Sequence, residues 1–147
     1  MRFNGRMTTT PPPTPPNFPP QNVPPQYVPP QPLSPNDERL WSTLIHVGGI
    51  FFSFIPALIG YLTLKDRGPF IRAHSTTALN FQLTVLIASF AAGIVAGVLT
   101  ATLIFAPIGF LLIVAVGIYL VVFSIIAAIA ANKGEFYKYP FTIEFVK

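Results

Sequence analysis

The longest stretch of this chain without a charged side chain runs from Ser75 to Asn132, 58 residues with no Asp, Glu, Lys or Arg. A soluble fold needs charged surface along such a length, because about 25% of the residues of an ordinary soluble domain are charged. The hydrocarbon core of a bilayer needs none, and about 20 apolar residues cross it as a helix. The whole chain is 52% hydrophobic and 10% charged. The sequence therefore predicts an all-α membrane protein.

The apolar pattern predicts a bundle of three transmembrane helices. The first is expected over residues 40–64, the second over 70–105 with its first turns at the membrane surface, and the third over 108–131. The first would be about 37 Å long, which exceeds the hydrocarbon thickness of about 30 Å. Pro56 is expected to bend this helix, since neighbouring helices can compensate a lost backbone hydrogen bond.

Residues 1–39 predict a disordered Pro/Gln-rich tail. They contain 13 of the 17 prolines, and proline disfavours both helix and sheet because it fixes φ and lacks the backbone donor. The Pro-Pro-Gln unit recurs at Pro19, Pro24 and Pro29. Such a segment serves either as a spacer or as a ligand for a groove that accepts PxxP segments. No Arg or Lys flanks the repeat to fix the orientation of a ligand, and this favours the spacer.

Residues 132–147 form a short aromatic tail. Phe141, Ile143 and Phe145 alternate with other residues at the period of a strand, but a lone strand is unstable in water. The tail therefore lies on the membrane surface, folds back on the bundle or pairs with a partner. The membrane surface is the favoured interpretation.

Lys and Arg residues predict the orientation, because cytoplasmic loops carry an excess of them. Six lie in the first loop and the C-terminal tail, against Arg39 on the other side. The six are Lys65, Arg67, Arg72, Lys133, Lys138 and Lys147. This bias predicts a multi-pass membrane protein with a cytoplasmic C-terminus and an external proline-rich tail. In the alternative topology, the first span is a re-entrant hairpin broken at Pro56, and both ends stay inside.

Two rows of small or polar residues are candidates for helix packing. Small residues on one helix face let two backbones approach closely in lipid. One row on the first span consists of Ser42, His46, Gly49, Ser53, Pro56 and Gly60, and one row on the second span consists of Ser89, Gly93, Gly97 and Ala101. The second row would contact either the first span or another copy of the chain. We interpret His46 as a packing residue, although an ionisable group in a span is a functional candidate by default.

Three polar residues stand where the second span enters the membrane, His74, Asn80 and Gln82. We expect Asn80 and Gln82 to form hydrogen bonds between helices. A metal site that pairs His74 with His46 is rejected, because the predicted topology puts the two residues on opposite sides of the membrane. Two histidines with no thiolate and no membrane-embedded carboxylate are also a poor ligand set.

Several function classes find no support in the sequence. No phosphate loop, nucleophile elbow, HExxH motif or close carboxylate pair is present, and we predict no enzyme activity and no cofactor. Cysteine is absent, which excludes disulfides. The net charge of +4 is spread too thinly to predict a nucleic-acid partner, and no apolar segment near the N-terminus predicts a signal peptide.

Three motifs together resemble a known family. They are ERLWSTLIHVGG at 38–49, PFIRAH at 69–74 followed by ALNFQ at 78–82, and NKGEFYKYP at 132–140. This pattern resembles a bacterial family of uncharacterised small three-span membrane proteins, distantly similar to the twenty-kilodalton Tic subunit of the chloroplast protein import machinery. Ser75, Thr76 and Glu144 depart from the basic residues that the family pattern leads us to expect near these positions. The resemblance implies an assembly or translocation role by analogy, and it carries over no catalytic or binding residue.

Together these features predict a non-enzymatic accessory or assembly component. Its expected partners are the lipid bilayer and other membrane proteins or further copies of itself. The alternative is a subunit of a homo-oligomeric pore or transporter. That alternative is weakened by the few polar residues that the spans offer to line a path.

Overall fold

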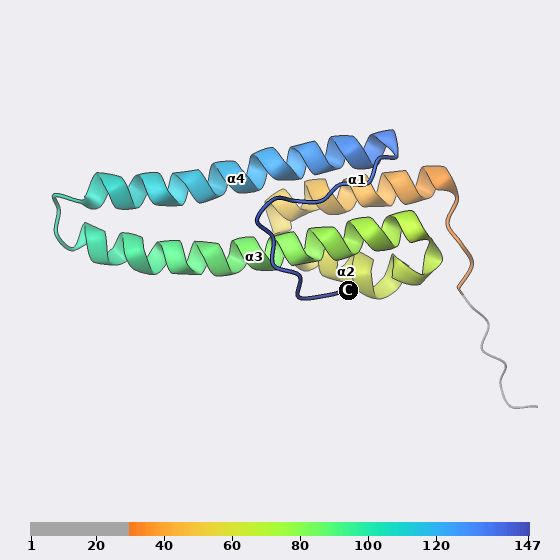
Figure 1. Cartoon of the computed structure of the whole chain (residues 1–147), viewed down its shortest axis with the longest axis horizontal. Helices are drawn as coiled ribbons and strands as arrows, with labels where there is room; N and C mark the ends of the chain where they lie inside the picture. Colours follow the sequence, from red (N-terminus) through yellow and green to blue (C-terminus); the bar gives the residue numbers. More distant parts are fainter. Residues whose placement is uncertain (1–29) are drawn as a thin grey trace, which may run out of the picture.

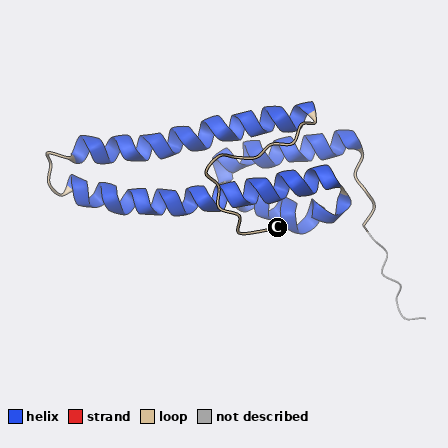
Figure 2. Cartoon of the chain, viewed as in Figure 1, coloured by secondary structure: helices blue, strands red, loops and turns tan. Residues whose placement is uncertain are grey.

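The structure is a computed structural model, and it describes residues 30–147. Four α-helices follow one another: α1 (Pro35–Phe52), α2 (Ile55–Leu64), α3 (Pro69–Thr100) and α4 (Ala106–Lys133). A 3-10 turn, η1 (Lys65–Arg67), joins α2 to α3, and a helix-free tail of residues 134–147 follows α4. The described part of the chain contains no strand (Figure 2), so the all-α prediction is confirmed. The predicted disorder of residues 1–29 lies outside the described residues.

The helix α1 begins earlier than the sequence indicated. Ser34 is its N-cap, with a side chain that accepts a hydrogen bond from the backbone N–H of Asp37 at 3.2 Å, and Pro35 occupies the first turn. Proline suits this position because its missing N–H would be unpaired there anyway. The proline-rich tail expected over residues 1–39 therefore overlaps the first turn of α1.

Residues 40–64 form a helical hairpin, which corrects the prediction of one continuous span. The chain turns at Ser53, whose φ is 55°, and Pro56 starts the new helix α2. The two helices approach closely, because a Cβ added at Gly60 would collide with the Ile45 side chain. The break near Pro56 is the one that the alternative topology requires.

The hairpin brings the start of α1 back to the end of α2. The backbone N–H of Leu33 donates to the carbonyl of Arg67 at 2.7 Å, and the Arg67 guanidinium donates to the carbonyl of Gln31 at 3.0 Å. The tail after α4 lies toward the same end of the molecule (Figure 1). All charged residues of the described chain lie outside 75–132, so the far loop of residues 101–105 carries none. The expectation that the chain before α1 and the C-terminal tail lie on opposite sides is therefore wrong for residues 30–34.

Within residues 30–147, two helices, not three, are long and apolar enough to cross a membrane. They are α3 with 32 residues and α4 with 28, about 48 and 42 Å long. Only 17% and 11% of their most apolar stretches are buried within the protein, unlike the core helices of a soluble domain. Both run side by side well beyond the hairpin (Figure 1). The helices α3 and α4 approach closely at Gly109, whose added Cβ would lie 3.1 Å from the Cα of Ala96.

Single-cysteine labelling tests the hairpin directly, because the chain has no native cysteine. We expect Ser34→Cys and Asp66→Cys to react with an impermeant maleimide from the same side of the membrane. Thr102→Cys, in the loop between α3 and α4, is expected to react from the opposite side. The cysteine-free parent chain is the control for background labelling. If Ser34→Cys and Asp66→Cys reacted from opposite sides, the segment 40–64 would cross the membrane and the hairpin would be wrong.

Candidate functional site

The two histidines of the chain meet in the interior. His46 on α1 and His74 on α3 are each 1% exposed, and 2.9 Å separates Nε2 of His46 from Nδ1 of His74. The hairpin of α1 and α2 places the start of α1 at the same end of the molecule as the start of α3. Both histidines therefore lie within about three helical turns of that end. The prediction that they lie on opposite sides of the membrane is therefore wrong.

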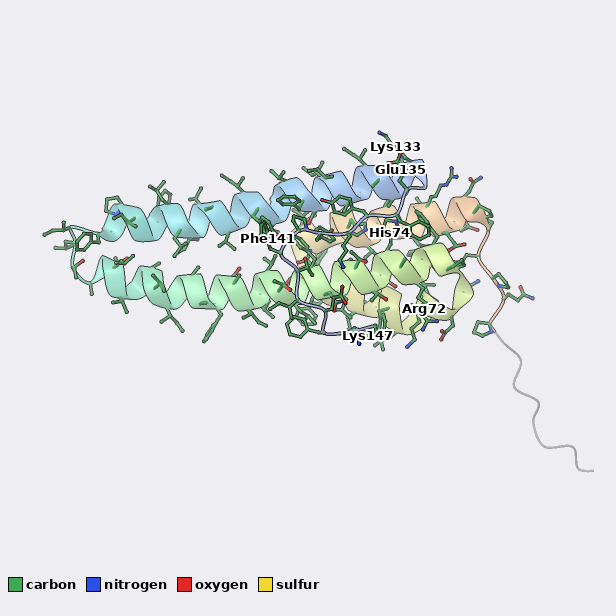
Figure 3. All side chains as sticks on the ribbon, in the orientation of Figure 1. Arg72, His74, Lys133, Glu135, Phe141 and Lys147 are labelled. Carbon is green, nitrogen blue, oxygen red and sulfur yellow. The ribbon has the colours of Figure 1, made fainter. Side chains whose placement is uncertain are left out.

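The C-terminal tail supplies a hydrogen-bond partner at each end of the histidine pair. The Tyr139 hydroxyl lies 2.8 Å from Nδ1 of His46, and the Glu135 carbonyl lies 3.0 Å from Nε2 of His74. The Tyr139 ring is 3% exposed and stacks on Phe81 with ring centroids 3.7 Å apart. Figure 3 shows His74 beside the C-terminal tail, close to Glu135. We call these four groups the histidine ladder: Tyr139, His46, His74 and the Glu135 carbonyl.

One carbonyl group fixes the direction of every hydrogen bond in the ladder. The Glu135 carbonyl can only accept, so Nε2 of His74 donates, and Nδ1 of a neutral His74 must accept from Nε2 of His46. Nδ1 of His46 then accepts from the Tyr139 hydroxyl. Burial raises the pKa of Tyr139, which keeps this hydroxyl protonated and able to donate. With both rings neutral, each histidine therefore carries its proton on Nε2.

The ladder leaves no ring nitrogen free for other chemistry. All four imidazole nitrogens have a partner within the protein, so metal binding or proton abstraction there would first have to break the ladder. Within residues 30–147, no three His, Cys, Asp or Glu side chains gather closely enough to hold a metal ion. A third proton on the pair would have to reverse the hydrogen bonds to His46, since Nδ1 of His74 would then donate and Nδ1 of His46 would donate to the Tyr139 oxygen. The arrangement suits a buried structural connection between α1, α3 and the tail.

Asn80 holds the far part of the tail. Its Nδ2 donates to the Val146 carbonyl at 2.8 Å, and its Oδ1 accepts from the backbone N–H groups of Phe145 and Val146 at 2.9 and 2.8 Å. The Thr84 hydroxyl accepts from the backbone N–H of Ile143 at 3.0 Å. The expectation that Asn80 bonds between helices is wrong, because its partners belong to the tail. The tail folds back on the bundle, and the favoured placement on the membrane surface alone is corrected.

The first predicted packing row divides at the hairpin turn. Ser42, His46 and Gly49 are buried on α1, Gly60 is buried on α2, and Ser53 is exposed at the turn. A Cβ at Gly49 would collide with the amide of Gln82, so Gln82 of α3 lies directly against α1. Pro56 starts α2. The row thus packs in part against the second half of its own predicted span.

Within residues 30–147, no other helix covers the second predicted packing row. Ser89, Gly93, Gly97 and Ala101 are all exposed, and a Cβ at Gly93 or Gly97 would meet nothing within 4 Å. The contact with α4 uses the adjacent face of α3, where Ala92 and Ala96 are buried. The alternative in which this row contacts the first span is therefore excluded for the single chain.

The sequence did not single out Tyr139 or Glu135. Tyr139 lies 93 residues from His46 and Glu135 lies 61 residues from His74, and no local pattern marks such pairs. A signal was present in part, because a tail with five aromatic residues is unusually rich in side chains that suit a bundle interior.

The fold and the ladder together define a small α-helical membrane protein with two long apolar helices and a helical hairpin. The chain belongs to the magnetosome magnetite crystal formation protein family, MamF/MmsF, whose model matches residues 37–146. Comparisons with curated proteins and with solved structures found no match. The family match supports the bacterial family that the three sequence motifs indicated. It gives no support to the likeness to the Tic subunit.

The Tyr139→Phe variant tests the ladder. The variant keeps the ring that stacks on Phe81 but leaves Nδ1 of His46 buried without a donor, which should lower the free energy of unfolding by about 1–3 kcal/mol. Thermal unfolding in mild detergent and hydrogen–deuterium exchange of residues 135–147 measure this effect. The matched control is Tyr137→Phe, since the Tyr137 hydroxyl makes no hydrogen bond within the described chain. Equal stability and equal exchange in the two variants would refute the ladder.

Proposed function

We propose that this protein is a non-enzymatic membrane component that assembles with other membrane helices through the uncovered half of α3 and α4. The family to which it belongs is named for magnetite crystal formation in the magnetosome. For this chain, the proposal assigns a role within the membrane rather than on a mineral surface. The position of the exposed small residues on α3 and α4 supports this role. Within residues 30–147, no three His, Cys, Asp or Glu side chains gather closely enough to hold a metal ion.

The observation that carries the proposal is the difference in length between the hairpin and the long helices. The hairpin helix α1 has 18 residues, whereas α3 has 32. Leu79 of α3 is buried in the cluster that includes residues of α1 and α2. Gly97 lies 18 residues further along, which is about five full turns on the same helix face. The face that holds the hairpin therefore continues beyond its tip with no cover.

Small residues form this uncovered face. We define it by Ser89, Gly93 and Gly97 of α3 and Gly117 of α4. The glycines have open space where a side chain would stand, and Ser89 and Gly117 line a shared groove of about 180 Å³ between α3 and α4. In lipid, helices associate through close backbone approach at small residues rather than through the hydrophobic effect. A helix of another chain would fit this face more closely than lipid tails can.

The buried polar groups do not favour an enzyme or a carrier. His46, His74 and Tyr139 bond to one another or to the tail, and Asn80 makes three hydrogen bonds to the tail. Large apolar side chains dominate the exposed surface of α3 and α4. A partner that contacts this surface therefore meets packing surface and no reactive group.

Substitution at Gly93 tests the proposal. Gly93→Leu is expected to preserve the fold, since its new side chain points into open space. It should lower crosslinking to partner membrane proteins in intact cells about tenfold, because close helix contacts in lipid are worth about 1–2 kcal/mol. Crosslinked material is purified in mild detergent and identified by mass spectrometry.

Two matched variants interpret the result. Ala91→Leu adds the same side chain to an exposed position about 200° around the same helix, and it should leave crosslinking unchanged. Ala92→Leu enlarges a buried residue and should destabilise the fold, which provides a reference for misfolding. Equal crosslinking in the Gly93→Leu and Ala91→Leu variants would contradict the proposed face. Recovery of this chain alone, in a ring that conducts solutes in liposomes, would favour the homo-oligomeric pore instead.

A further inference from the structure

A pocket of about 340 Å³, lined by several polar side chains, lies where the tail crosses α3. Thr76, Thr77 and Asn80 form its α3 side. Its tail side is formed by Lys138, Tyr139, Thr142, Glu144, Val146 and Lys147. Asn80 and Tyr139 hold the two walls together through the tail contacts described above. The pocket is therefore a product of the folded tail and does not exist on α3 alone.

The pocket has an excess of positive charge. Its side chains supply two ammonium groups and one carboxylate, and the carboxylate of Glu144 already accepts a hydrogen bond from Nζ of Lys138 at 2.9 Å. This contact with Lys138 holds the pKa of Glu144 below its usual range, so the carboxylate stays charged and paired. Lys147 forms no ion pair within the described part of the chain. Among these side chains, the ammonium group of Lys147 is left for a ligand.

Two hydroxyl donors stand beside this charge. Thr76 and Thr77 are half-buried on the first turns of the uncharged run, and neither hydroxyl bonds to another group of residues 30–147. By contrast, the hydroxyls of Thr84 and Thr100 donate to the carbonyl four residues earlier. Two free hydroxyls and an uncompensated ammonium group suit an oxyanion that carries a single negative charge, as a phosphodiester does.

The pocket lies at the boundary between the charged and uncharged parts of the molecule. Arg72 is the last charged residue of α3, and Thr76 follows it by about one turn. Beside the pocket, Phe141, Ile143 and Phe145 turn outward and are 92%, 54% and 47% exposed. Figure 3 shows Phe141 at the point where the tail reaches furthest along the bundle, with Lys147 on the returning part. Exposed aromatic residues beside lysines are typical of the membrane interface.

From this geometry we infer that the pocket binds the phosphate group of an anionic membrane lipid. Lys147 and the Thr76 and Thr77 hydroxyls contact the phosphate oxygens, and Lys138 adds positive charge from its pair with Glu144. The acyl chains lie against the outward Phe141, Ile143 and Phe145. Basic pockets next to transmembrane helices bind lipid headgroups in this way. The lipid source is favoured over free phosphate because an apolar rim of three side chains borders the pocket.

Lipid retention by the full chain tests this inference. The protein is purified in mild detergent with equal amounts of phosphatidylglycerol and phosphatidylcholine of matched chain length, and native mass spectrometry counts the lipids retained. We expect one phosphatidylglycerol to remain bound in preference to phosphatidylcholine. The double variant Lys138→Ala/Lys147→Ala should lower that bound fraction about tenfold or more. No preference for the anionic lipid in the parent protein would overturn the inference.

A charge-matched control separates the pocket from general electrostatic attraction. Arg39→Ala/Lys133→Ala removes two positive charges from the same end of the molecule and touches no residue of the pocket. It should leave the bound fraction unchanged, and an equal loss in both double variants would overturn the inference. Thr76→Val/Thr77→Val removes only the hydroxyls and should weaken retention without a change in charge. Hydrogen–deuterium exchange of the tail confirms that each variant remains folded.

Two further experiments test whether the bound phosphate group belongs to a lipid, and what Glu144 contributes. A large excess of inorganic phosphate should fail to displace the lipid, because phosphate lacks the acyl chains that contact the rim. Full displacement would show that the pocket takes free phosphate and would overturn the lipid assignment. Glu144→Gln frees Lys138 and should increase retention of phosphatidylglycerol. Reduced retention in that variant would contradict the proposed arrangement of charges.

Discussion

The hydrogen bond between His46 and His74 is the contact on which the arrangement of this chain depends. It joins residues 28 positions apart, and the tail residues that complete it come from 61 and 93 positions away. A buried polar group that lacks a hydrogen bond is costly, so neither histidine can stay inside without the other and without the tail. The ladder therefore couples the docking of the hairpin to the folding of the C-terminal segment. Loss of one partner leaves a remaining group of the ladder buried without a hydrogen bond, which lowers the free energy of unfolding.

The short length of the α1–α2 hairpin connects the histidine ladder to the proposed function. Because α1 and α2 turn back near Ser53, they cover only the half of α3 and α4 that lies near the charged end (Figure 1). The other half retains an uncharged, apolar surface with a smooth face at Gly93, Gly97 and Gly117. One half of the molecule thus holds a locked polar core and a headgroup pocket. The other half is uncovered within residues 30–147, and it is the surface that we propose for contact with lipid and partner helices.

Much of the helical architecture follows from the sequence, whereas the hairpin does not. The long run without charges predicts α3 and α4, and Pro107 lies in the first turn of α4, where a proline is tolerated. Residues 40–64 are long enough for one span, and a proline inside a membrane helix is usually tolerated. The backward turn depends on the positive φ of Ser53 and on the fit of Gly60 against Ile45. These are tertiary features that hydrophobic periodicity does not encode. Similarly, composition singles out His46, His74 and Asn80, but only the fold reveals that the tail is their partner.

The protonation state of the two histidines tests the central claim most directly. Nitrogen-15 NMR of the full chain in detergent micelles distinguishes neutral histidine with the proton on Nε2 from the other tautomer and from the charged form. The ladder requires both His46 and His74 to be neutral at pH 7 with the proton on Nε2, and a coupling across the bond from Nε2 of His46 to Nδ1 of His74. A charged ring, a proton on Nδ1 of either residue, or the averaged spectrum of a solvent-exposed imidazole would contradict the account.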